Sequence, residues 1–90
     1  MVKLFNVMEW LINQELKRLL DHFPQACQCE RCILDMTAFA LNQLPSHYIV
    51  SPQGELYAKA KQFETQAQAD LQRVLTQAIE VVTESPRHEK

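Results

Sequence analysis

The sequence predicts an all-α domain, and three observations support that prediction. The chain of 90 residues has only one glycine and four prolines, so it is poor in residues that end helices or form turns. Apolar residues recur at three- and four-residue spacing over long stretches, as in amphipathic helices. The hydrophobic fraction of 47% is typical of a globular protein. We therefore expect one domain over residues 1–90, with three main helices.

The first helix is expected over residues 3–22. Phe23-Pro24 ends it, because a proline disfavours the helical conformation in the residue before it. Polar residues interrupt its apolar positions, so the segment does not resemble a signal peptide, and no apolar run is long enough to span a membrane. The apolar residues form one stripe: Leu4, Val7, Met8, Leu11, Ile12, Leu16, Leu19 and Leu20.

The second helix is expected over residues 29–43, and Leu44-Pro45-Ser46 ends it. Residues 47–50 then form a short β-prone segment. This extended segment is too short to build a sheet alone, but it could pair with its copy in a dimer. The expected inner face of the helix consists of Cys32, Ile33, Met36, Phe39, Ala40 and Leu44.

The third helix is expected over residues 52–84, because Ser51-Pro52 offers a side-chain cap followed by a proline in the first turn. A helix of roughly 30 residues measures ~45 Å, at 1.5 Å per residue. It would overhang a core made with two shorter helices, and its excess apolar surface predicts an intertwined homodimer. Residues 85–90 are expected to form a flexible polar tail. The apolar stripe contains Leu56, Ala60, Phe63, Ala67, Leu71, Val74, Ala78 and Val82.

All three cysteines lie in residues 27–32, at the expected start of the second helix. Cys27, Cys29 and Cys32 have a spacing that would let two or three thiolates fold onto one zinc ion. A fourth ligand would come from His22, Glu30, water or a second subunit. The thiols could instead pack as small buried hydrophobic groups, or have a redox role. The βαβ pattern that usually accompanies a redox Cys-x-x-Cys is absent.

Arg31 and Asp35 lie four residues apart, on one face of the second helix. They could form an ordinary surface ion pair. They could also recognise a ligand, because a guanidinium can bind the O6/N7 edge of guanine and a carboxylate can accept from its N1–H and N2–H groups.

Other candidate residues lie around the loop that leads into the third helix. Tyr48 and Tyr57 could stack on bases, with His47 alongside, or could cover the core with their hydroxyls in water. Asn42 is either a ligand contact or a local cap. No catalytic arrangement stands out, so we do not expect an enzyme.

The motifs CQCERC, AFALNQLP and GELYAK, together with Asp35 and Tyr48, resemble those of the ComFB family. The resemblance runs from Asn6 to Glu80, and the Pro86-Arg87-His88 near the C-terminus is like that of relatives. It implies a small, helical, dimeric protein. Some members bind zinc through cysteines, and cyanobacterial members are described as receptors for cyclic dinucleotides, chiefly cyclic di-GMP. Relatives often carry proline-arginine-tyrosine where this chain has Ser46-His47-Tyr48, so His47 would replace an arginine with a weaker, pH-dependent donor.

With this resemblance, we expect a homodimeric receptor for cyclic di-GMP, or also for cyclic di-AMP, that relays binding to a downstream protein. The expected ligand-binding residues are Arg31, Asp35, Asn42, His47, Tyr48 and Tyr57. The alternative is a zinc-stapled helical interaction module that binds no nucleotide. A net charge of −2 argues against nucleic-acid binding. We expect no membrane association and a cytoplasmic location, where thiols stay reduced.

Overall fold

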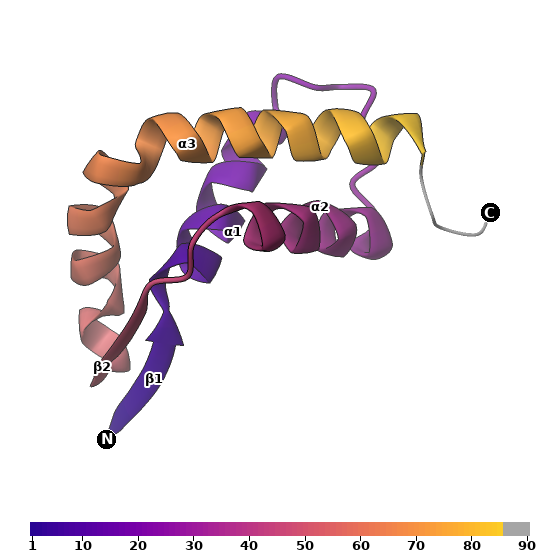
Figure 1. Cartoon of the computed structure of the whole chain (residues 1–90). Helices are drawn as coiled ribbons and strands as arrows, with labels where there is room; N and C mark the ends of the chain where they lie inside the picture. Colours follow the sequence, from indigo (N-terminus) through magenta and orange to yellow (C-terminus); the bar gives the residue numbers. More distant parts are fainter. Residues whose placement is uncertain (86–90) are drawn as a thin grey trace.

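The computed structural model describes residues 1–85, which form three helices and two short strands (Figure 1). Each helix packs against the other two, and the strands project from one end of the bundle (Figure 1). Apart from Ser85, the tail predicted over 85–90 lies outside the described residues. The elements in chain order are β1 (Val2–Asn6), α1 (Val7–Leu20), α2 (Glu30–Gln43), β2 (Tyr48–Pro52), a 3-10 helix (Gln53–Glu55) and α3 (Leu56–Glu84).

The prediction of three main helices is confirmed, but the predicted start of the first helix is wrong. Residues 3–6, assigned to the first helix, belong to β1, which pairs antiparallel with β2. The extended segment predicted over 47–50 is confirmed over residues 48–50, which belong to β2, and its partner within the chain is β1. We call these two paired strands the ribbon. Long-range pairing explains the error, because periodicity in one segment carries no information about its partner.

Asn6 makes the junction between the ribbon and α1. Its Oδ1 accepts from the backbone N–H of Met8 at 3.2 Å, which caps α1, and from the backbone N–H of His47 at 3.0 Å. The backbone N–H of Val7 also donates to the carbonyl oxygen of His47 at 2.7 Å. Asn6 therefore starts the helix and fixes the chain that enters β2.

The predicted cap of the third helix is also wrong. Ser51 is buried in β2, where its hydroxyl contacts Glu55 Oε1 at 3.3 Å, and α3 begins at Leu56. The second helix begins within one residue of its prediction, with Cys29 as its N-cap.

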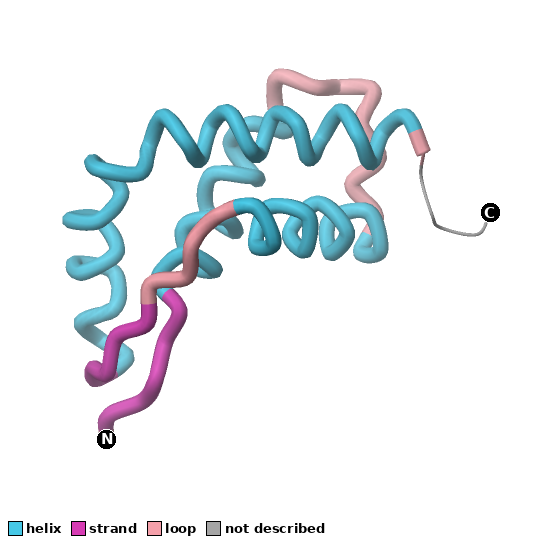
Figure 2. The backbone as a smooth tube through the Cα atoms, viewed as in Figure 1, coloured by secondary structure: helices cyan, strands magenta, loops and turns pink. Residues whose placement is uncertain are grey.

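Helix α3 bends sharply near its middle (Figure 2). Its N-terminal half, residues 56–69, runs beside the ribbon, whereas its C-terminal half, residues 70–84, runs along α2 (Figure 2). The helix therefore does not overhang the core as one straight rod. None of the described helices is both long and apolar enough for a membrane span.

The hydrophobic core lies between α1, α2 and the C-terminal half of α3. The predicted apolar stripes are largely confirmed, except that Leu4 is exposed on β1. Fully buried core side chains include Met8, Leu11, Ile12, Leu16, Leu20, Met36, Leu71, Leu75 and Ile79.

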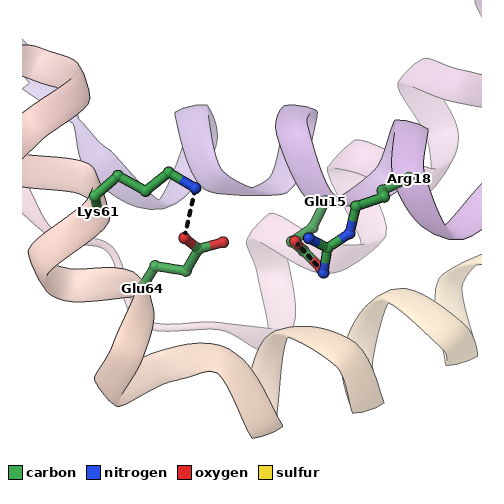
Figure 3. Close-up of polar contacts among 4 residues, drawn as sticks. All are labelled: Glu15, Arg18, Lys61 and Glu64. Atoms are coloured by element: carbon green, nitrogen blue, oxygen red, sulfur yellow. Dashed lines mark hydrogen bonds and ion pairs between the residues drawn. The ribbon is translucent and has the colours of Figure 1, made fainter.

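Charged side chains line the contact between α1 and the N-terminal half of α3 (Figure 3). Arg18 pairs with Glu15 at 2.9 Å, and Lys61 pairs with Glu64 at 3.1 Å. The Glu15 side chain is only 3% exposed although Arg18 is 63% exposed. These two pairs form a polar seam beside an otherwise apolar interface.

Candidate functional site

The three thiols form a cluster at the N-terminus of α2. The α1–α2 connector delivers Cys27, Cys29 caps the helix, and Cys32 lies in its first turn. Their sulfur atoms all lie within 4.8 Å of one another. The backbone N–H of Cys32 donates to Cys29 Sγ at 3.4 Å, which satisfies a helix N–H that has no partner within the helix.

The environments of Cys29 and Cys32 differ strongly. Cys29 is exposed, and the hydrogen bond from the Cys32 backbone lowers its pKa. Cys32 is fully buried, and burial raises its pKa to about 12. Cys27 is half-buried. The cluster thus combines one accessible sulfur whose pKa is lowered with one shielded sulfur whose pKa is raised.

The cluster also fits part of a zinc site. Zinc–sulfur bonds of about 2.3 Å in a tetrahedral site place the thiolates ~3.8 Å apart. The observed separations, at or below 4.8 Å, need only small side-chain movements to reach that arrangement. Within residues 1–85, the candidate metal-binding group contains only the three cysteines, so neither His22 nor Glu30 joins it. A fourth ligand would come from water or a second subunit.

Arg31 and Asp35 form the predicted ion pair, with Arg31 Nε 3.6 Å from Asp35 Oδ2. Their side chains are 51% and 20% exposed. Asp35 Oδ2 is itself buried, and within the described part of the chain it has no hydrogen-bond partner. A buried carboxylate oxygen without a hydrogen bond is costly, so this atom is ready to accept a donor.

Asp35 and Asn42 line one cavity between α2 and the end of α3. Its volume is about 400 Å³. The wall combines these two polar side chains with the aromatic ring of Phe39 and the aliphatic side chains of Val81 and Val82. A flat molecule that carries hydrogen-bond donors on its edge matches this lining.

The structure places His47 in a different cavity, of about 350 Å³, between the ribbon and the N-terminal half of α3. Its ring stacks on Phe63, with centroids 4.2 Å apart and planes 7° from parallel. Lys59 also lines this second cavity. A stacked pair of flat rings beside a cation is a surface on which a base or phosphate could rest.

The two predicted tyrosines lie apart from both cavities. Tyr48 is exposed on β2. The rings of Tyr57 and Trp10 are nearly perpendicular, with their centroids 5.6 Å apart. Lys61 Nζ lies 5.7 Å from the centroid of the Tyr57 ring. Within one chain, the predicted ligand-binding residues therefore divide among several places.

The sequence predicts Phe39 and Phe63 on the inner faces of their helices, and both are half-buried and line cavities. Helical spacing selects residues that face inwards, but it does not distinguish a core residue from a cavity wall.

Comparison with known proteins supports a single family. A model of the family described as "Late competence development protein ComFB" matches residues 5–86. A comparison with curated proteins found no match.

Among solved structures, the chain resembles the late competence protein ComFB from Bacillus subtilis, with 29% sequence identity and a TM-score of 0.77. The match covers 93% of this chain and 94% of that one. Because sequence and fold agree over nearly the whole length, this chain belongs to the ComFB family.

Proposed function

We propose that this chain is a receptor for cyclic dinucleotides, with cyclic di-GMP as the first ligand to test and cyclic di-AMP as the second. In this proposal it acts as a homodimer, relays ligand binding to a downstream protein and catalyses no reaction. The observation that carries the proposal is Asp35 Oδ2, which is buried without a hydrogen bond in the described residues.

The cavity around Asp35 suits guanine. The N1–H and N2–H groups of guanine could both donate to a carboxylate, which would satisfy Oδ2. Asn42 offers a further donor and acceptor, and Phe39 offers a face for stacking. Arg31 is half-exposed beside Asp35, so its guanidinium could turn towards a phosphate or the O6/N7 edge of the base.

A cyclic dinucleotide has two bases and two phosphates, so it needs more contacts than the Asp35 cavity offers. The cavity lined by His47 and Lys59 offers a second aromatic surface and a cation. Since these contacts are divided within one chain, we propose that a second copy helps to complete the ligand site.

The ribbon supports a homodimer because one of its faces is apolar and uncovered. Leu4 is paired with Val50 in the strand register, so their side chains share one face, and they are 67% and 65% exposed. Val2 and Tyr48 lie on the same face and are also exposed. The equivalent face of a second copy has matching chemistry and would bury these side chains.

Calorimetry at fixed salt tests ligand binding. Arg31→Ala is expected to weaken cyclic di-GMP binding more than tenfold, because a lost charged hydrogen bond costs ~1.5–3 kcal/mol. Asp35→Asn should also weaken binding and shift the preference away from guanine. Asp70→Asn is the control, because Asp70 is an exposed residue of α3 that pairs only with Arg73 in the described structure. No heat from wild type with either dinucleotide would refute the receptor proposal.

Sedimentation tests the dimer. Leu4→Asp is expected to shift the protein from dimer to monomer, because it places a charge at the centre of the apolar face. Leu34→Asp is a matched control, since Leu34 is 59% exposed on α2, away from the ribbon. A wild-type monomer of 10.5 kDa at micromolar concentration would refute the dimer.

The clustered sulfurs favour one alternative function, a zinc-stapled interaction module. In that case a chelator should lower the melting temperature, and replacing any one of Cys27, Cys29 or Cys32 with serine should lower zinc content. Unchanged melting with chelator, in a protein without bound metal, would favour packed thiols.

A further inference from the structure

We propose that Cys29 and Cys32 form a redox-active dithiol, in which Cys29 is the attacking sulfur and Cys32 the resolving sulfur. The oxidant would be a peroxide, and the product an intramolecular disulfide at the start of α2. This proposal concerns the thiols in the metal-free protein and does not depend on nucleotide binding.

The first argument is the unequal exposure of the two residues. Cys29 is exposed at the helix cap, whereas Cys32 is 0% exposed and packs in the core. An oxidant can therefore reach Cys29 Sγ and is excluded from Cys32 Sγ. This difference in access assigns the two roles without reference to the third thiol.

The second argument is distance. The two sulfurs lie within 4.8 Å of each other, and the residues are three apart, across the first turn of α2. The hydrogen bond from the Cys32 backbone to Cys29 Sγ holds the attacking sulfur next to the residue that would resolve it. Closing the remaining gap to an S–S bond of ~2.05 Å needs a change in side-chain torsions in the first turn of α2.

The chemistry balances in two steps. Cys29 sulfur attacks one peroxide oxygen, the O–O bond breaks, and the products are a Cys29 sulfenic acid and one water. Cys32 sulfur then attacks Cys29 sulfur, the S–O bond breaks, and the hydroxyl leaves as a second water with the Cys32 proton. Two thiols lose two electrons and two protons in total, and the hydrogen peroxide is reduced to two waters.

The disulfide would also change the local structure. An S–S bond draws Cys29 Sγ away from the backbone N–H that it now accepts from. It also pulls on a side chain packed in the core. Arg31 lies between the two cysteines in the sequence and pairs with Asp35, four residues further along the same helix. Oxidation would therefore also move the Arg31–Asp35 pair.

The experiment treats the full-length protein, stripped with a chelator, with one equivalent of hydrogen peroxide. Mass spectrometry of the intact protein and of its peptides then identifies the product. We expect a loss of two hydrogens and a Cys29–Cys32 disulfide. Cys29→Ser should slow peroxide consumption at least tenfold. Cys32→Ser should leave the first step intact, so a sulfenic acid at Cys29 should be trapped by dimedone.

Cys27→Ser separates this pair from the third thiol. If the proposal is right, this variant still forms the Cys29–Cys32 disulfide. A wild-type disulfide that contains Cys27, or a loss of oxidation in Cys27→Ser equal to that in Cys29→Ser, would overturn the proposal.

A measurement on the unmodified wild type guards against variants that do not fold. Brief treatment with iodoacetamide should label Cys29 first and Cys32 last, by at least a tenfold difference in rate. Equal labelling of Cys29 and Cys32 would overturn the assignment of roles.

Discussion

The two halves of α3 contact the rest of the molecule through different chemistry. The C-terminal half packs into the core with buried residues Leu71, Val74, Leu75, Ala78, Ile79 and Val82. In the N-terminal half only Ala60 and Ala67 are buried, and the contact with α1 includes the polar seam of Figure 3. One continuous helix therefore has an anchored half and a lightly held half.

The same division separates the two cavities. The cavity with Asp35 lies against the anchored half, and the cavity with His47 lies against the lightly held half. A ligand that touched both would couple a rigid surface to one with few buried contacts. Such a ligand would contact α3 on both sides of its bend, so binding would act on the angle between the two halves.

The largest test of this comparison is Leu75→Ala. Leu75 is fully buried in the anchored half, and its truncation should lower the free energy of unfolding by ~2–5 kcal/mol. Leu56→Ala, in the half-buried first turn of α3, should cost less than half as much. Urea denaturation measures both, and equal losses would show that the two halves are anchored alike.

The polar seam gives the next largest effect. Arg18→Met removes the partner of a buried carboxylate and should cost ~1–3 kcal/mol. Arg73→Met is a matched control, because Arg73 is also 63% exposed and also pairs with an acidic residue three positions away, but its partner Asp70 is 67% exposed. We expect the control to change stability by less than ~0.5 kcal/mol. Thermal denaturation measures both variants. Losses of stability of similar size would mean that the Arg18–Glu15 pair stabilises the fold no more than the exposed Arg73–Asp70 pair.

The junction of ribbon and bundle should show a smaller effect. Asn6→Ala removes both hydrogen bonds of Oδ1 and should cost ~0.5–2 kcal/mol. Hydrogen exchange should speed up at Met8 and His47, whose N–H groups lose their acceptor. Asn13→Ala, an exposed position on α1, should leave both rates unchanged. Unchanged hydrogen exchange in Asn6→Ala would mean that contacts other than those of Asn6 attach the ribbon to the bundle.

The smallest effect is expected at Lys61. The hydrogen bond to Glu64 raises the pKa of the Lys61 ammonium above its ordinary value of 10.5. The folded state therefore holds this proton more tightly than the unfolded state, so the stabilisation is complete below pH 10.5 and is lost as pH rises through the raised pKa. The difference in melting temperature between wild type and Lys61→Met should shrink over that range. If the difference in melting temperature stayed constant with pH, the stabilisation by Lys61 would not come from its charge.

Part of the candidate site followed from local sequence. The C-x-C-x-x-C spacing brings the three sulfurs together, because Cys29 and Cys32 lie in one turn at the start of α2 and Cys27 comes two residues before that turn. The Arg31–Asp35 pair followed from four-residue spacing in the same way. The cavity around Asp35 did not, because Val81 and Val82 come from a helix more than forty residues away in the chain.

The sequence by itself determined the three helices, most of their buried stripes, the thiol cluster and the family. Each depends on residues a few positions apart, where helical periodicity and capping act directly. Only the tertiary structure decided that Val2–Asn6 is a strand, that α3 bends and that the predicted ligand residues lie in several separate places, with Asp35 and Asn42 in one cavity and His47 in another. Strand pairing, bending and cavity walls arise from contacts between distant segments, and the periodicity of one segment does not contain them.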